Sequence, residues 1–321
     1  MNASVSTPHI AAIVNPRSGG GATGRSWRLI AAGLEAELGP VRAHFTSSPS
    51  TPRYLPATEL TREALKAGAQ LVIAVGGDGT INEVMNGFFE NGVAINPDAH
   101  IAILNTGTGG DFRKTFDLPP ELEGCIKRIG QGTTKQIDLG LLTFTSADGG
   151  EGTRYFNNIA SFGLSGEVVR TINRAKYSKI FGGAFAFFWA TLKASFFYKT
   201  KPVRIVTDAG FDETMNVGVC AVANGMFFGG GMMIAPTAVP DDGLFDITIM
   251  RDTTFSDMLS GGGSMRDGTH VNGPKVLTLR ARSVTATPVG PDPVLLDVDG
   301  EGPGRLPARF DILPAAITLR C

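Results

Sequence analysis

The sequence has little charge and little cysteine. Charged residues make up 18% of the 321 residues, and 29 basic residues nearly balance 30 acidic ones. Because the net charge is only −1, the composition predicts no nucleic-acid partner, and any attraction to a membrane or an anion has to be local. The three cysteines, Cys125, Cys220 and Cys321, have no CxxC or paired spacing. This pattern favours a reduced, cytoplasmic protein without disulfides.

Long hydrophobic runs and zinc-binding patterns are also missing. The longest apolar stretch, residues 180–192, has thirteen residues, whereas a membrane-spanning helix needs about 20. The N-terminus lacks the basic and apolar segments of a signal peptide. The four histidines form no HExxH or similar motif. We therefore expect no transmembrane helix and no zinc site in this chain, whose length suggests two domains.

Residues 71–87 combine a buried strand, a glycine turn and a helix. Residues 71–75 are continuously apolar, as in a parallel strand covered on both faces. Three of the next four residues are glycines, which let a ligand approach the backbone closely. Apolar residues then recur at helical spacing up to Phe89. A helix N-terminus behind a glycine turn favours anions, and phosphate most commonly.

Asp78 is unusual because it places a carboxylate where a phosphate is expected to bind. Two anions repel each other unless a divalent cation or a set of hydrogen-bond donors lies between them. Asp78 therefore indicates a metal–nucleotide complex as the ligand. The structural alternative is that Asp78 merely caps the helix that follows.

The sequence around Asp78 resembles the signature of the diacylglycerol kinase catalytic domain. Gly-Gly-Asp-Gly-Thr at residues 76–80 continues as Ile-Asn-Glu-Val-Met-Asn-Gly at residues 81–87. This superfamily includes sphingosine, ceramide and bacterial lipid kinases. The first five residues are also shared with NAD kinases, whereas the continuation through Asn82 and Glu83 favours lipid kinases. Five motifs in the order of the family extend the resemblance over residues 9–317.

Two further loops carry the resemblance on the nucleotide side. Residues 15–19, Asn-Pro-Arg-Ser-Gly, match the Asn-Pro-x-Ser-Gly motif of the family. Residues 107–112 are similar to its Gly-Thr-x-Asn-Asp-Phe segment, except that Gly110 replaces the family's Asn, and Asp111 has the alternative role of a helix cap. The resemblance implies the following ATP-binding residues: Asn15, Pro16, Arg17, Ser18, Gly19, Gly20, Gly21, Thr46, Gly76, Gly77, Asp78, Gly79, Thr80, Ile81, Asn82, Glu83, Gly107, Thr108 and Asp111.

The C-terminal half has a different texture. Short strand-like runs separated by Gly, Pro, Asp and Asn predict an antiparallel sandwich or barrel. A helical insert at residues 165–198 is basic first and aromatic later. It suits a membrane surface or an acyl-chain pocket, and equally a core helix with a solvated basic end.

Two acidic turns in this half also match the family. The segment Pro-Asp-Asp-Gly-Leu-Phe-Asp at residues 240–246 implies a structural Mg²⁺ bound by the Asp242 carboxylate and the carbonyl oxygens of Val239 and Leu244. Without the resemblance, an Asp-Gly hairpin turn is the simpler interpretation. Asp299 and Glu301 flank Gly300, a pairing that suits metal binding and proton acceptance from a hydroxyl. The alternative for this second turn is a solvated hairpin.

Together these features predict an α/β plus β protein. We expect a doubly wound parallel-sheet ATP-binding domain at residues 1–135, with a returning tail at 308–321. A β-sandwich or barrel-like lipid domain at residues 136–307 is expected to close the active site in a cleft between the two. The predicted reaction is transfer of phosphate from ATP, with Mg²⁺, to a primary hydroxyl of diacylglycerol or a sphingolipid. Asp78, Asp299 and Glu301 are its candidate catalytic residues, with Glu301 as the base.

Several alternatives stay open at this stage. An NAD kinase would use the same glycine–aspartate turn, and a non-catalytic nucleotide- or lipid-binding protein would fit the loss of Asn at position 110. We expect a cytoplasmic protein that contacts the membrane surface transiently. The sequence does not determine the oligomeric state, a homodimer being one option, nor which lipid alcohol is the acceptor.

Overall fold

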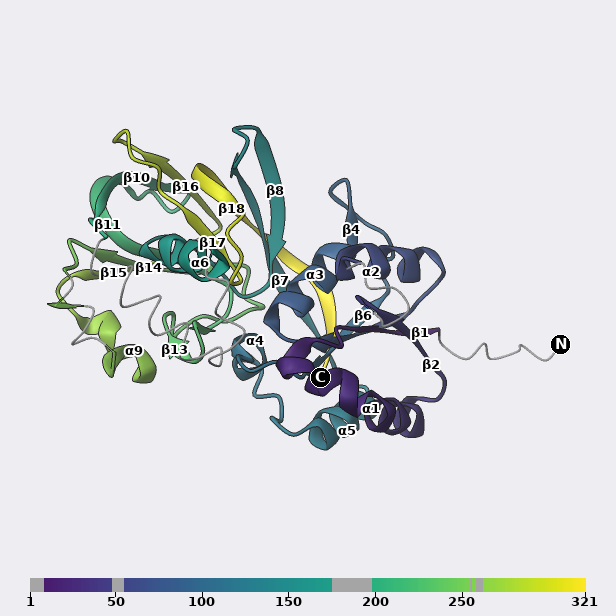
Figure 1. Cartoon of the computed structure of the whole chain (residues 1–321). Helices are drawn as coiled ribbons and strands as arrows, with labels where there is room; N and C mark the ends of the chain where they lie inside the picture. The colour runs from purple at the N-terminus through teal and green to yellow at the C-terminus, as the bar shows by residue number, and fades with distance from the viewer. Residues whose placement is uncertain (1–8, 48–54, 175–197, 255, 258–261) are drawn as a thin grey trace. The chain divides into compact units, whose positions relative to one another are not determined.

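The computed structural model describes residues 9–47, 55–174, 198–254, 256–257 and 262–321. The chain forms two compact units, Met1–Ile137 with Ala316–Cys321, and Asp138–Ala315 (Figure 1). The apolar run at 180–192 and most of the insert predicted at 165–198 lie outside the described residues. Within the described ranges, no helix combines the length and the apolar character needed to cross a bilayer.

A parallel sheet forms the centre of the first unit. Its strand order is β2-β1-β3-β6, and residues 318–320 add a parallel strand beside β6. Every residue of β1 and β3 is buried, because both faces of the sheet are covered. The strands are β1 (Ile10–Val14), β2 (Val41–Phe45), β3 (Leu71–Gly76) and β6 (His100–Asn105).

Helices cover both faces of this sheet. Helices α1 (Ala22–Leu38) and α5 (Leu122–Gln131) pack Leu34 and Ile126 against one face. Helices α2 (Ala57–Lys66) and α3 (Asp78–Gly87) pack together on the other face (Figure 1). This is the doubly wound arrangement that the alternation of strands and helices predicts, and the predicted fold class is confirmed.

The second unit is an antiparallel β structure. Its strands follow the order β15-β14-β11-β10-β16-β18, and β9 pairs with β11 and β17. A bulge at Val217 and Val219 divides β11, which pairs first with β10 and then with β9. The core between the strands contains stacked aromatic rings, with 5.5 Å between the ring centroids of Phe156 and Phe245.

The strands of the second unit are β7 (Thr134–Ser146, which starts in the first unit), β8 (Glu151–Phe156), β9 (Ile159–Gly163), β10 (Lys201–Thr207), β11 (Asp212–Ala223), β14 (Phe245–Arg251), β15 (Val276–Ala281), β16 (Ser283–Pro288), β17 (Leu296–Val298) and β18 (Gly304–Arg320, which ends in the first unit). The short elements of the chain are η1 (Ser18–Gly21), β4 (Phe89–Glu90), β5 (Val93–Ala94), α4 (Asp111–Thr115), β12 (Phe227–Phe228), β13 (Met232–Met233), α9 (Ser264–Asp267) and η2 (Thr269–Asn272).

Two features of the strands depend on their partners. Residues 134–146 form the single long strand β7, and β8 pairs with it from Gly140 onward. The chain is then divided between β8 and β9 at residues 157–158. The split occurs because the main-chain N–H of Asn157 donates to a carboxylate oxygen of Asp299, 3.0 Å away, and not to a strand neighbour.

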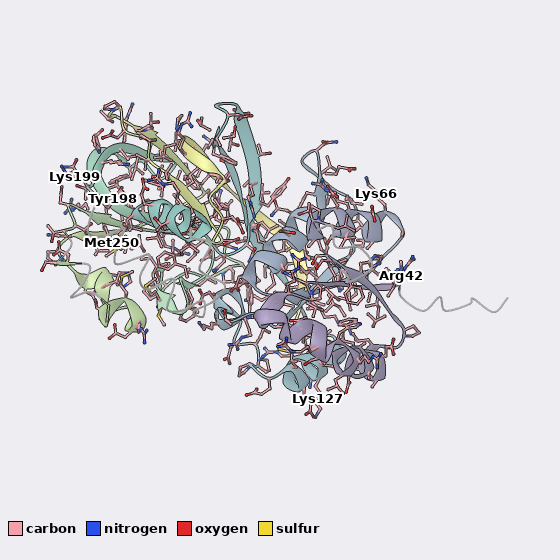
Figure 2. The ribbon with its side chains drawn as sticks, viewed as in Figure 1. Arg42, Lys66, Lys127, Tyr198, Lys199 and Met250 are labelled. Carbon is pink, nitrogen blue, oxygen red and sulfur yellow. The ribbon has the colours of Figure 1, made fainter. Side chains whose placement is uncertain are left out.

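The described part of the insert is helix α6 (Leu164–Arg174). Its Leu164 and Val168 pack with Tyr198 and Met250 in a small apolar cluster. Figure 2 labels Tyr198 and Met250. The ammonium of Lys201 lies 5.5 Å from the centre of the Tyr198 ring. The chain on both sides of residues 175–197 is therefore anchored to the second unit.

Candidate functional site

Three loops of the first unit gather at one edge of its sheet. They follow β1, β3 and β6, and these strands are parallel and in register, with Val75 opposite both Val14 and Leu104. Because parallel strands end at the same edge, the three loops come together at the position where open α/β sheets bind ligands. We call them the phosphate loops, residues 15–21, 76–80 and 105–111.

Hydrogen bonds hold the phosphate loops together. The hydroxyl groups of Thr23 and Thr106 are 2.6 Å apart, and the main-chain N–H of Thr106 donates to the carbonyl oxygen of Gly76 at 2.8 Å. The side-chain amide of Asn15 donates to the Thr80 hydroxyl at 3.1 Å. The predicted residues Asn15, Gly76 and Thr80 are thus brought together by direct contacts. Thr23 and Thr106 were missed, and their only sequence signal is their position beside a glycine loop.

Glycines allow the phosphate loops to approach each other. A Cβ atom on Gly107 would lie 2.5 Å from the Cα of Gly77, and one on Gly19 would lie 2.6 Å from the carbonyl oxygen of Thr106. Real Cβ atoms do not come this close to backbone, so any larger residue would push the loops apart. Gly19 and Gly107 are therefore required by packing between loops that are distant in sequence.

The N-terminus of α3 faces this loop cluster without a side-chain cap among the described residues. Its first amide groups follow Gly77, and the N–H of Ile81 is the first to bond back, to the carbonyl oxygen of Gly77 at 3.0 Å. The amides of Asp78, Gly79 and Thr80 therefore remain available to an anion. This observation supports the predicted phosphate site.

Asp78 is held in the cluster by one of its two carboxylate oxygens. Oδ2 accepts the main-chain N–H of Gly110 at 2.8 Å. Oδ1 is buried and has no hydrogen-bond partner among the described residues. Burial, and then the charge of Asp111, raise the pKa of the Asp78 carboxyl, while main-chain N–H groups, that of Gly110 first, oppose this shift. A positive partner at Oδ1 would therefore stabilise an ionised Asp78.

A magnesium ion fits that requirement when the nucleotide supplies its other ligands. Mg²⁺ is usually bound by one or two carboxylates together with phosphate oxygens and water. No group of three His, Cys, Asp or Glu side chains is placed to bind a metal within the described ranges. Asp78 Oδ1 would thus be a single protein ligand, and Asp111, which pairs with Lys114 at 2.9 Å, is its acidic neighbour.

Other residues predicted to bind ATP have different surroundings. The Thr46 hydroxyl is buried without a hydrogen-bond partner in the described structure, and it follows β2 at the same sheet edge. Glu83 lies against α2, where its carboxylate accepts the N–H of Ala57 at 2.7 Å. Asn82 and Ile81 are fully buried. The nucleotide contacts expected of these side chains stay predictions.

The remaining predicted ATP-binding residues lie on the phosphate loops. Arg17, Gly20 and Thr108 are exposed, and the others are partly buried. This group consists of Pro16, Arg17, Ser18, Gly20, Gly21, Gly79 and Thr108.

The acidic turn of the second unit divides its carboxylates between different roles. Both oxygens of Asp299 accept main-chain N–H groups, from Asn157 at 3.0 Å and from Ile159 at 2.8 Å. The side chain of Glu301 is exposed. Asp299 thus holds the turn between β8 and β9, whereas Glu301 is accessible to a substrate.

Asp297 is a third carboxylate of this turn that the sequence analysis missed. Its Oδ1 accepts the N–H of Gly300 at 3.0 Å. Burial, with added repulsion from Asp299 and Glu301, raises the pKa of Asp297 to about 7. The only sequence signal for it was a third acid two residues before the predicted pair.

The predicted structural Mg²⁺ site has a different set of contacts. Asp242 forms an ion pair with Arg280 through Oδ2, and its Oδ1 accepts the N–H of Leu244 at 3.0 Å. Asp138 also holds this loop by accepting the N–H of Gly243 at 2.7 Å. Both oxygens of Asp242 are thus occupied, and the donor set does not fit an added cation without breaking the ion pair. Binding of Mg²⁺ by Asp242, Val239 and Leu244 stays a prediction.

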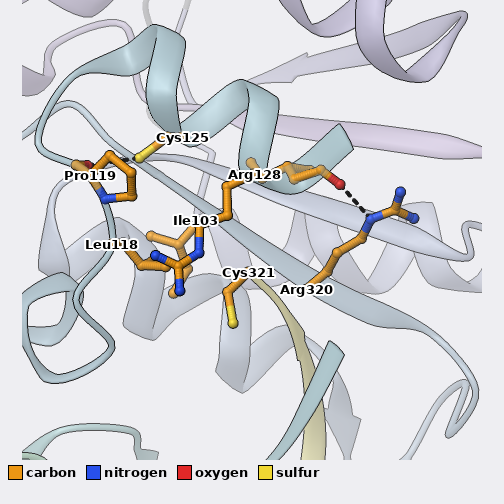
Figure 3. A pocket seen from close by; sticks show the side chains of 8 residues that line it. Ile103, Leu118, Pro119, Cys125, Arg128, Arg320 and Cys321 are labelled. Carbon is orange, nitrogen blue, oxygen red and sulfur yellow. Dashed lines mark hydrogen bonds between the residues drawn. The ribbon is translucent and has the colours of Figure 1, made fainter. Parts of the chain in front are cut away.

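A pocket in the first unit lies apart from the predicted residues (Figure 3). Here the thiol of Cys125 donates to the carbonyl oxygen of Pro119 at 2.9 Å, and Arg320 Nε donates to that of Ile129 at 2.7 Å. Burial raises the pKa of Cys125 and keeps it a thiol. The lining is therefore structural. It consists of Ile103, Leu118, Pro119, Cys125, Arg128, Ile129, Arg320 and Cys321.

Comparisons with known proteins agree with this architecture. The family described as diacylglycerol kinase catalytic domain matches residues 9–142, and the family described as YegS C-terminal NAD kinase beta sandwich-like domain matches residues 158–321. A diacylglycerol kinase of Staphylococcus epidermidis is 30% identical over 267 residues, which cover 83% of this chain and 78% of that protein.

Solved structures share the fold. A diacylglycerol kinase from Bacillus anthracis has a TM-score of 0.68 at 21% identity, with 97% of this chain and 96% of that chain covered. Yeast NADH kinase complexed with NADH has a TM-score of 0.51 at 11% identity, with 98% and 83% covered. The family models and the sequence relatives thus support a kinase with an α/β unit and a β-sandwich-like unit. The chain belongs to the diacylglycerol kinase family.

Proposed function

We propose that this protein transfers the γ-phosphoryl group of ATP, with Mg²⁺, to the primary hydroxyl of a lipid. The acceptor class is diacylglycerol or a sphingolipid such as ceramide or a sphingoid base. The observation that supports this proposal most directly is the unpartnered, buried Oδ1 of Asp78 beside an uncapped helix N-terminus in the described structure. A carboxylate in that position favours a cation, and the amides beside it favour an anion. The magnesium complex of a nucleotide satisfies both.

On the nucleotide side, the phosphate loops position the phosphates of ATP. The amides of Asp78, Gly79 and Thr80 donate to phosphate oxygens, and Thr108 and Asp111 complete the site. Asp78 would hold the Mg²⁺, which would neutralise part of the phosphate charge. Phosphoryl transfer depends mainly on such positioning and charge stabilisation.

On the acceptor side, we assign proton acceptance to Glu301. The lipid hydroxyl oxygen forms a bond to the γ-phosphorus while the bond to the bridging oxygen of ADP breaks, and the hydroxyl proton passes to the Glu301 carboxylate. Asp299 positions this turn through its two main-chain hydrogen bonds. An exposed carboxylate beside a fixed turn is suited to this proton transfer.

The first experiment measures transfer of labelled phosphate from ATP, with Mg²⁺, to diacylglycerol, ceramide, sphingosine and NAD in parallel. We expect label on one of the lipids and its loss in Asp78→Ala. Label on NAD alone would overturn the lipid kinase proposal in favour of an NAD kinase. The fold shared with yeast NADH kinase favours this second candidate. No label on any acceptor, in a protein that still binds ATP, would favour a binding protein without kinase activity.

Replacement of the proposed base separates binding from chemistry. Glu301→Gln should lower kcat by about 10² to 10⁴ and leave the KM for ATP unchanged, since positioned proton transfer contributes about that factor. Glu213→Gln, at an exposed glutamate of β11, is the matched control. Near-normal turnover of Glu301→Gln would rule out Glu301 as the base.

Membrane contact by the insert at 165–198 also stays a prediction.

A further inference from the structure

Asn105, the last residue of β6, has a fixed side-chain amide. Its Oδ1 accepts the main-chain N–H of Gly107 at 2.8 Å, which closes a tight turn at the start of the third phosphate loop. Because this bond fixes the plane of the amide, it also fixes the position of Nδ2. The nitrogen lies against Gly110, where a Cβ atom would overlap it.

The Nδ2 group of Asn105 is a hydrogen-bond donor without an acceptor. In the described part of the chain, no hydrogen bond uses this nitrogen. It lies next to the Gly110 N–H that binds Asp78, and a Cβ on Gly110 would also lie 3.3 Å from the Nε of Arg113. Asp78 already uses the Gly110 N–H, which leaves Asn105 Nδ2 and Arg113 Nε as neighbouring donors beside Gly110. Two such donors favour an anionic ligand.

We propose that Asn105 Nδ2 binds a phosphate oxygen of the nucleotide and replaces the side-chain amide that Gly110 lacks. This inference rests on the proposed function. The two positions compete for one space, because a side chain at residue 110 would overlap the Asn105 amide in the orientation that Gly107 holds. Gly110 has φ +66°, a conformation that Asn adopts more readily than most residues. An Asn at position 110 is therefore disfavoured by the Asn105 amide and not by its own backbone.

The test exchanges the amide between the two positions. Asn105→Ser keeps an oxygen that can accept the Gly107 N–H but removes the distal amide. The double variant Asn105→Ser with Gly110→Asn restores an amide in the same space. Gly110→Asn alone forces two side chains into one space. Asn96→Ser is the matched control, because Asn96 Oδ1 accepts the N–H of Asp98 at 3.2 Å in the same kind of turn, outside the phosphate loops.

Titration calorimetry with ATP and Mg²⁺ measures the dissociation constant of each folded variant, and a thermal melt measures its stability. We expect Asn105→Ser to bind ATP about 10- to 100-fold more weakly, the range for a hydrogen bond to a charged group. The double variant should recover at least about half of that loss on a logarithmic scale. Asn96→Ser should bind ATP normally, and Gly110→Asn should melt earlier than the double variant.

The outcomes separate this inference from the proposed function. Failure of the wild-type protein to bind ATP would overturn both. Normal ATP affinity in Asn105→Ser, beside a wild type that binds ATP, would overturn the role of Asn105 alone. A lower melting temperature with unchanged affinity would make Asn105 purely structural. Absence of any recovery in the double variant would refute the exchange of the amide between the two positions.

Discussion

Asp78→Asn should make the protein more stable and inactive. The carboxylate of Asp78 is partly buried, lies near Asp111, and leaves Oδ1 without a partner in the described structure. An asparagine at this position keeps an oxygen that can accept the Gly110 N–H. It replaces the unpartnered charged oxygen by an amide nitrogen, which can donate to the neighbouring Asp111. Nucleotide chemistry is lost because no charged ligand remains for Mg²⁺.

The sign of the pH dependence follows from the raised pKa. Burial and Asp111 raise the pKa of Asp78 in the folded state, so the folded protein holds this proton at pH values where the unfolded chain has lost it. The free energy of unfolding therefore falls as pH rises from about 4, the usual pKa of aspartate, through the folded pKa. The amide of the Asp78→Asn variant has no proton to lose in this range. The variant should be more stable by about 1 kcal/mol above this window, the lower end of the range for an unsatisfied buried polar group, because Asp78 is only partly buried.

The assay follows the first unit through Trp27, whose ring meets that of Phe45 edge to face at 5.5 Å. The chain has two tryptophans, so Trp27 is the only one left when Trp189 is replaced by Phe. Urea unfolding monitored by its fluorescence is compared at about pH 3, below the usual pKa of aspartate, and at about pH 8. Asp98→Asn, at an exposed aspartate of the same unit, is the matched control.

The expected result is a stability gain for Asp78→Asn at the higher pH that shrinks at the lower one, with loss of turnover. Asp98→Asn should differ from its parent by no more than about 0.5 kcal/mol at either pH. A variant that is less stable than its parent at the higher pH would refute the reasoning. In that case Asp78 would be stabilised in the folded state as an anion.

Two further predictions concern loop packing and the acidic turn. Gly107→Ala places a Cβ 2.5 Å from Gly77 Cα, so ATP should bind more than about tenfold more weakly in a titration, and a thermal melt should show a stability loss of about 1–3 kcal/mol. The control is Gly290→Ala, whose Cβ would lie 3.7 Å from Pro202. Normal ATP affinity in Gly107→Ala would contradict the close approach of the loops. Burial raises the pKa of Asp297 to about 7. The free energy of unfolding, measured with urea, should therefore fall as pH rises from about 4 to about 7 in the wild type, and should fall less in Asp297→Asn. Equal pH profiles for the two proteins would show that Asp297 does not titrate in this range.

The order of elements around the phosphate loops could be predicted from the sequence. An apolar run, a glycine turn and an amphipathic helix follow one another within residues 71–87, and each signal depends on neighbouring residues. Local periodicity of this kind determines strands, helices and their alternation, and hence the doubly wound sheet. The motif also identified Asp78 as the unusual residue of the turn.

The partners of individual side chains depended on the tertiary structure. Asp299 and Asn157 are 142 positions apart, yet their hydrogen bond orders the acidic turn and ends β8. Glu83 matched the motif, but its carboxylate caps α2, whose first residue, Ala57, lies 26 positions earlier. The Asn105 amide fills the space that a Cβ on Gly110 would need, a contact within one loop that periodicity does not record. Sequence periodicity records which face of an element is buried, whereas hydrogen bonds between distant residues form only when packing brings their atoms within about 3 Å.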